Sequence, residues 1–67
     1  MDMRRRFHIY YEDEAGVKHY VTKKLFSFHY HSNIEWAEEF SPYSQVAKFV
    51  REQPETTASV LHCEEIV

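Results

Sequence analysis

The fold is decided by residues 41–53, which have the sequence SPYSQVAKFVREQ and carry the strongest helix signal in the chain. Ser41 is expected to cap the first turn through its hydroxyl, and Pro42 to take the first helical position, where a missing N–H costs nothing. Pro54 is expected to end the helix, because the residue before a proline avoids helical angles. The apolar residues at helical spacing are Tyr43, Val46, Ala47, Phe49 and Val50. A helix this short is marginal alone, so this side must pack against the rest of the chain.

The N-terminal half predicts a β-hairpin. Phe7–Glu12 alternates between two faces, which is typical of a strand. Glu14–Gly16 fits a three-residue loop in which the glycine takes the left-handed position, and a second strand is expected over Val17–Lys23. The pairs that this loop implies are Asp13 with Val17, Tyr11 with His19, Tyr10 with Tyr20, and Ile9 with Val21.

The middle of the chain leaves two alternatives open. Leu25–His31 alternates again and is either a third strand or a bent continuation of the second. Ser32 and Glu35 fit a capping box, which favours a short helical turn over Ile34–Phe40. The alternative is a strand over Asn33–Phe40 that pairs with the preceding one.

After the main helix, Glu55–Thr57 is expected to be a loop and Ala58–Val67 the last strand. The chain thus predicts a single α+β domain over residues 1–67. Its architecture is a small antiparallel sheet of three to four strands with one main helix packed on one face. A chain of 67 residues buries only about 60% of its unfolded surface, so we expect one small core without a deep pocket.

Composition narrows the classes of function. Hydrophobic residues make up 43% of the chain, which is too apolar for a disordered tail. The net charge of −3 argues against non-specific binding to nucleic acid, which needs a basic surface. Cys63 is the single cysteine, so an internal disulfide is impossible and a reducing, cytoplasmic location is expected. The longest uncharged run, Leu25–Ile34, is too short and too polar to span a membrane.

The sequence contains no recognised catalytic motif. Phosphate-binding loops, dinucleotide fingerprints, zinc-protease helices and nucleophile elbows are all absent, so we expect a non-enzyme without a cofactor. His29 and His31 would point to one side of a strand and could reach His62, but this spacing is a weak zinc signal, and no metal is expected. Cys63 has no activating neighbour in the sequence and is expected to be buried and inert.

The spare aromatic residues point to a partner. One helix layer covers one face of a sheet, whereas this sheet has aromatic residues on both faces, so some aromatic residues are expected to be exposed. They are Tyr10 and Tyr20, with Phe26, Phe28 or Tyr30 as further candidates. The expected contact surface is therefore the second face of the sheet or a free edge strand. Tyrosine is enriched where proteins meet, which predicts a host protein or protein complex as partner, or a homodimer. The predicted partner-binding residues are His8, Tyr10, Tyr20 and the acidic Glu12, Asp13, Glu14, Glu38 and Glu39.

The alternative function is nucleic-acid binding. The basic run Arg4–Arg6 would contact phosphates, and the tyrosines of the sheet would stack on bases. The net negative charge makes this the weaker of the two hypotheses.

The layout also resembles a known class of proteins. A hairpin precedes the helix start at Phe40-Ser41, the helix core is Ala47–Val50, and a strand closes the chain. This order is similar to that of short bacteriophage accessory proteins, among them phage inhibitors of host RNA polymerase. The resemblance covers Phe7–Val67 in layout but contains no specific motif, so it assigns no functional residue. It implies a small non-catalytic protein that binds and blocks a host protein, such as a polymerase or a CRISPR effector.

Overall fold

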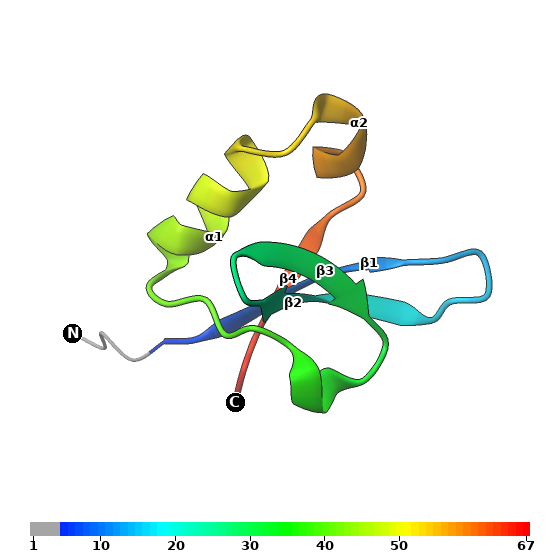
Figure 1. Ribbon diagram of the computed structural model, residues 1–67, viewed down its shortest axis with the longest axis horizontal. Coiled ribbons are helices and arrows are strands. Elements are labelled where there is room, and N and C mark those ends of the chain that lie inside the picture. Colours follow the sequence, from blue (N-terminus) through cyan, green and yellow to red (C-terminus); the bar gives the residue numbers. More distant parts are fainter. Residues whose placement is uncertain (1–4) are drawn as a thin grey trace.

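A computed structural model describes residues 5–67 and shows a sheet with a helical layer over one face (Figure 1). Its four strands form one antiparallel sheet in the order β3-β2-β1-β4. The predicted α+β architecture is therefore confirmed. The elements are β1 (Phe7–Glu12), β2 (Lys18–Lys24), β3 (Ser27–His31), the 3₁₀ turn η1 (Ile34–Trp36), α1 (Tyr43–Arg51), α2 (Glu55–Ala58) and β4 (His62–Glu65).

The hairpin of β1 and β2 forms in the predicted register. Tyr10 pairs with Tyr20, and Tyr11 pairs with His19, as predicted. Gly16 has φ +80°, the left-handed conformation that the loop needs. The Asp13 carboxylate accepts hydrogen bonds from the backbone N–H groups of Ala15 (2.9 Å) and Val17 (3.0 Å). The side chain of Asp13 therefore stabilises the loop by hydrogen-bonding its backbone.

The core lies between α1 and the sheet. It consists of Phe7, Ile9, Val21, Phe40, Val46 and Phe49, with Val50 and Leu61 packed against it. The side chains of Ile9 and Val21 are completely buried at the centre of the sheet. Burial of these side chains is the main force that holds so short a helix in place.

A short extended segment, residues 37–40, fills a gap in the sheet. Phe40 exchanges two backbone hydrogen bonds of 2.9 Å with Phe7, and the N–H of Glu38 donates to the carbonyl of Val21 (2.8 Å). The ladder between β1 and β2 consequently starts at Tyr10, and the predicted pairing of Ile9 with Val21 is wrong. The segment satisfies the backbone groups that β1 and β2 leave unpaired where they separate.

Both ends of the main helix differ in detail from the prediction. Pro42 is the N-cap in an extended conformation and no side chain caps α1, so Ser41 is not the cap. The carbonyl of Pro42 instead accepts the N–H of Gln45 (2.9 Å). Beyond Pro54, a four-residue helix, α2, replaces the predicted loop and leaves β4 as a four-residue strand. Proline is favourable at the start of a helix as well as after its end, and for Pro54 the prediction considered only the end of the preceding helix.

The first ambiguous segment is resolved into a turn and a strand, and the second into a 3₁₀ turn and extended chain. Leu25 and Phe26 form a tight turn, so β3 is a separate strand that begins at Ser27. In the next segment Asn33, rather than Ser32, caps a short 3₁₀ turn through the N–H of Glu35 (2.9 Å). An Asn side chain closes such a tight turn locally, so the predicted helical turn ends at residue 36 and extended chain follows.

Candidate protein-interaction surface

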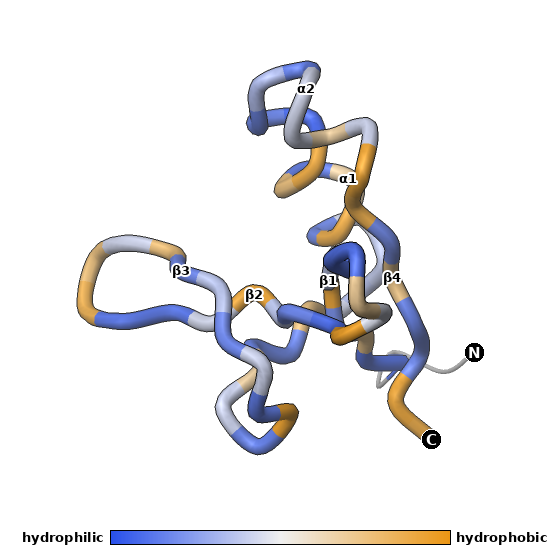
Figure 2. Tube along the Cα trace, turned by 90° about the vertical axis from the view of Figure 1, so that its right-hand side faces the viewer, coloured by the Kyte–Doolittle hydropathy of each residue, from blue (hydrophilic) through white to orange (hydrophobic). Residues whose placement is uncertain are grey.

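The hairpin of β2 and β3 extends away from the body of the molecule, as Figure 2 shows. Its turn carries Leu25 and Phe26, which are 83% and 101% exposed. Lys24 and Ser27 pair directly behind them. The two largest side chains of the tip therefore contribute almost no buried area to the fold, although each is strongly apolar.

Leu25 also has an unfavourable backbone conformation. Its φ of +56° makes it the one non-glycine residue with positive φ among residues 5–67. Positive φ at only the first of two turn residues is the pattern of a type II′ turn, where glycine is preferred. A side chain with a Cβ atom costs about 1–2 kcal/mol in the left-handed region. Backbone strain of this kind is concentrated at functional sites.

One side of the hairpin borders an open groove. The groove is lined by side chains of both strands and by Trp36 from η1. The indole ring lies 4.4 Å from the imidazole of His31 and is nevertheless 60% exposed. His29 is held in the groove by a 2.9 Å hydrogen bond between its Nε2 and the hydroxyl of Ser27. We define the hairpin surface as Lys24, Leu25, Phe26, His29, His31 and Trp36.

The predicted contact tyrosines lie on the sheet face opposite α1, but they pack on one another. The ring of Tyr20 is 5.6 Å from that of His8 and 5.8 Å from that of Tyr10. Tyr20 is only 7% exposed, so the prediction that it is exposed is wrong, and Tyr10 is half-buried. His8, a predicted partner-binding residue, is also only 7% exposed and is not accessible to a partner. Lys18 adds cover, with its Nζ 4.6 Å above the ring of Tyr10. The sequence pattern placed these residues on the correct face but could not show that they cover each other.

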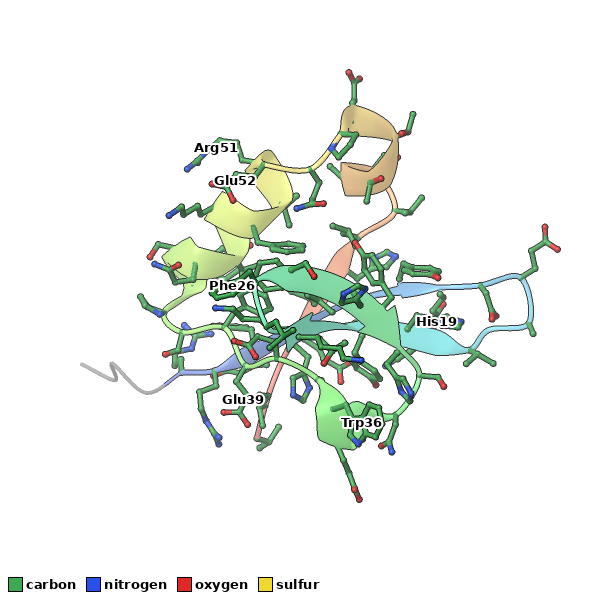
Figure 3. All side chains as sticks on the ribbon, viewed as in Figure 1. His19, Phe26, Trp36, Glu39, Arg51 and Glu52 are labelled. Carbon is green, nitrogen blue, oxygen red and sulfur yellow. The ribbon has the colours of Figure 1, made fainter. Side chains whose placement is uncertain are left out.

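The predicted acidic residues do not form one patch. Glu12, Asp13 and Glu14 lie at the turn between β1 and β2. Glu39 lies near η1 and the start of β1, and in Figure 3 it is well apart from His19, the β2 residue that contacts Asp13. The Asp13 carboxylate binds His19 Nε2 at 2.9 Å. This hydrogen bond is the main reason that the pKa of Asp13 is lowered.

Glu38 lies in the extended segment and is half-buried, whereas Glu39 is exposed beside Arg6. The guanidinium of Arg6 donates to the Glu39 carboxylate at 3.0 Å. Of the predicted acidic contacts, Asp13 and Glu39 are thus committed to partners within the fold.

The arginine run is also engaged by carboxylates. Arg5 makes two parallel hydrogen bonds to Glu65, at 2.9 and 3.0 Å, and this contact lowers the pKa of the Glu65 carboxyl. Arg6 is paired with Glu39, and Arg4 lies outside the described residues. Paired arginines present less positive charge to phosphates, and the buried Tyr20 cannot stack on a base. These contacts weaken the nucleic-acid hypothesis.

The histidines of the chain serve different contacts. His31 packs against Trp36 with the two rings tilted by 32°, whereas His62 packs against Tyr10 with their rings 5.5 Å apart. Within residues 5–67, no three His, Cys, Asp or Glu side chains gather in a way that could hold a metal ion. Cys63 is an exposed free thiol, so the expectation that it is buried is wrong. It lies on β4, an edge strand of the sheet, where one side of the strand has no neighbouring strand among the residues that the structure describes.

None of the helices in the described part of the chain is both long and apolar enough to cross a membrane. No protein-family model, curated protein or solved structure matches the chain. The resemblance to phage accessory proteins therefore stays a prediction.

Proposed function

We propose that the chain is a non-catalytic protein-binding module that contacts its partner through the hairpin surface. The observation that carries this proposal is the strained, solvent-exposed Leu25 beside a fully exposed Phe26. Neither residue is explained by folding, because glycine would fit the turn better and both side chains lie in water. Large apolar side chains at the centre of an interface provide most of its binding energy.

The chemistry of the surface indicates what the partner offers. Leu25 and Phe26 require an apolar pocket, and the half-exposed ring of Trp36 provides a second contact alongside it. Lys23 and Lys24 directly precede the turn and carry positive charge. The partner surface that suits this arrangement is an apolar pocket with an acidic rim, since opposite charges at the rim speed association.

This proposal relocates the contact surface expected from sequence. The buried His8 and Tyr20 would have to leave the fold to touch a partner, whereas the hairpin surface is accessible as it stands. Inhibition of a host protein, such as a polymerase or a defence complex, is the narrower form of the proposal. It is supported only by the layout that the chain shares with phage accessory proteins.

Capture of a partner by matched variants tests the proposal. The tagged chain is incubated with bacterial lysate, and the captured proteins are identified and quantified. Phe26→Ser is expected to reduce capture of a stoichiometric partner at least tenfold, because it removes the apolar anchor without a change in the core. Val60→Ser is the control, since Val60 is also exposed (51%) but lies between α2 and β4. Equal capture by the wild type and Phe26→Ser would refute the hairpin surface as the binding site.

A further inference from the structure

The two edges of the sheet are protected very differently. Strands β3 and β4 are the outermost strands. β4 contains Glu64 and Glu65, and charged side chains are a common protection against pairing at a sheet edge. β3 has the sequence SFHYH, without proline, lysine, arginine or acidic residues. Within the described chain, the backbone of β3 is hydrogen-bonded to β2 alone among the strands.

The pairing of β3 with β2 determines which backbone groups point outward. Lys24 and Ser27 flank the two-residue turn and form the first hydrogen-bonded pair of the ladder. In an antiparallel ladder such pairs alternate with pairs that are not hydrogen-bonded to each other. The N–H and C=O groups of Phe28 and Tyr30 therefore point away from β2.

A contact on the other side of β2 supports this assignment. Val21 is the partner of Tyr30 and should also direct its backbone groups away from the shared ladder. Its carbonyl indeed accepts the N–H of Glu38, on the side facing β1. The outward backbone groups of β3 thus belong to Phe28 and Tyr30, which lie symmetrically on either side of His29.

From this spacing we infer that β3 pairs with β3 of a second copy, antiparallel, around a two-fold axis at His29. Phe28 of each copy then lies opposite Tyr30 of the other. Each such pair exchanges two N–H···O=C hydrogen bonds, so the outward groups of both residues are satisfied. The two sheets become one continuous sheet across the dimer.

The side chains of the edge fit this partner. Phe28 is 45% exposed but is anchored on Phe49, with ring centroids 5.0 Å apart, and Tyr30 is anchored on Tyr11 at 5.1 Å. In the dimer each Phe28 meets the Tyr30 of the other copy, and aromatic residues that face each other across strands stabilise a sheet. β3 contains no Asp, Glu, Lys or Arg, so the residues that give the chain its net charge of −3 do not lie on this strand.

A second copy is favoured over a strand from another protein by symmetry. Any antiparallel strand has outward backbone groups at every second residue, so the side chains decide. An unrelated strand would need aromatic residues opposite Phe28 and Tyr30, whereas a second β3 places Tyr30 and Phe28 there by the two-fold symmetry. The inference does not rest on the proposed function, because it uses the outer backbone of β3 and not Leu25 or Phe26.

Solution mass with a matched pair of variants tests the dimer. Sedimentation equilibrium of the full chain from about 1 to 300 μM is expected to give the mass of two chains that falls to one on dilution. His29→Lys puts like charges opposite each other at the axis and should weaken dimerisation at least tenfold. His62→Lys makes the same change on β4, at the other edge, and should leave the dimer unaffected. A wild-type monomer at all concentrations would overturn the inference.

Cysteine cross-linking tests the axis itself. In a Cys63→Ser background, His29→Cys is expected to form a disulfide between two copies, because directly opposite residues that are not hydrogen-bonded to each other lie about 4.5 Å apart between Cα atoms. Ser27→Cys is the control, since two such residues would be separated by about four residues along the strands, or roughly 13 Å. Equal cross-linking of both variants, or of neither, would contradict the proposed axis.

Discussion

Leu25 shows most clearly how a single residue can serve something other than folding. Its side chain is 83% exposed and its φ is +56°, so it adds strain without burial. The sequence offered no signal for the turn, because neither Leu25 nor Phe26 is a turn-forming residue and both fit an alternating strand. The tip of the candidate surface could therefore not be predicted from the pattern alone.

Replacing Leu25 with glycine should stabilise the protein. Relief of about 1–2 kcal/mol of left-handed strain outweighs the greater entropy that glycine adds to the unfolded chain. We expect Leu25→Gly to raise the free energy of unfolding by about 0.5–1 kcal/mol, as measured by urea denaturation. Leu25→Ala keeps a Cβ atom and should change stability by less than about 0.5 kcal/mol. Destabilisation by Leu25→Gly would mean that the leucine side chain supports the fold.

Asp13 makes the turn between β1 and β2 sensitive to acid. Its pKa is lowered first by the hydrogen bond from His19 and then by the backbone N–H of Val17. A carboxyl with a folded-state pKa below its unfolded value contributes stability above the unfolded value. That contribution is lost as the pH falls from about 4 through the lower folded-state pKa.

We therefore expect the free energy of unfolding to fall on acidification below about pH 4. Asp13→Asn retains an oxygen acceptor for Ala15 and Val17 but cannot titrate, so its stability should depend less on pH in this range. Glu14→Gln is the control, because it removes an exposed carboxylate of the same turn and should follow the wild-type profile. Parallel profiles for all three proteins would show that the contact between Asp13 and His19 has no energetic effect. Chemical denaturation between pH 2 and 7 makes the comparison.

At the level of elements, the predictions that succeeded were those in which local signals agreed. The β1–β2 hairpin has alternation on both strands and Gly16 in its loop, and its register was correct near the turn. The prediction failed at Ile9, because there a third segment, residues 37–40, enters between the strands. That contact joins parts of the chain that are far apart in sequence, and no local pattern encodes it. The length of the closing strand was overestimated because of an ambiguous local signal. Pro54 can either end one helix or begin the next, and here it precedes α2.

The role of α1 leads to a contrast between two of its aromatic residues. Phe49 is 5% exposed and packs on Phe40 and Phe28, whereas Tyr43 is 53% exposed and touches Phe7 edge-on. Phe49→Ala should cost about 3–5 kcal/mol, which approaches the whole stability of a small domain. Tyr43→Ala should cost about 1 kcal/mol. Thermal unfolding followed by circular dichroism separates the two, and equal losses would place the core elsewhere along the helix.

At the scale of the whole molecule, the sequence correctly indicated more aromatic side chains than one small core can bury. The expectation was wrong for Tyr20, which is buried, and right for the β3 hairpin, where Phe26, Phe28 and Tyr30 are exposed. Tyr10, Tyr20 and His8 cover each other within one face, so the remaining aromatic surface lies at the β3 edge and at the hairpin tip. A surplus of aromatic residues in a sequence of this size therefore indicates an interface but not its location.

If β3 edges pair in solution, folding and association are coupled, and thermal stability depends on concentration. A chain this short gains relatively little from its own core, so the coupling should be large enough to measure. We expect the melting temperature of the wild type to rise by about 5 °C for each tenfold increase in protein concentration. His29→Lys should show this dependence only at concentrations at least tenfold higher than the wild type, because its dimer is at least tenfold weaker and a monomer unfolds without a change in molecularity. Differential scanning calorimetry over three decades of concentration measures both slopes, and a flat wild-type slope would mean that each sheet is stable with its β3 edge open to water.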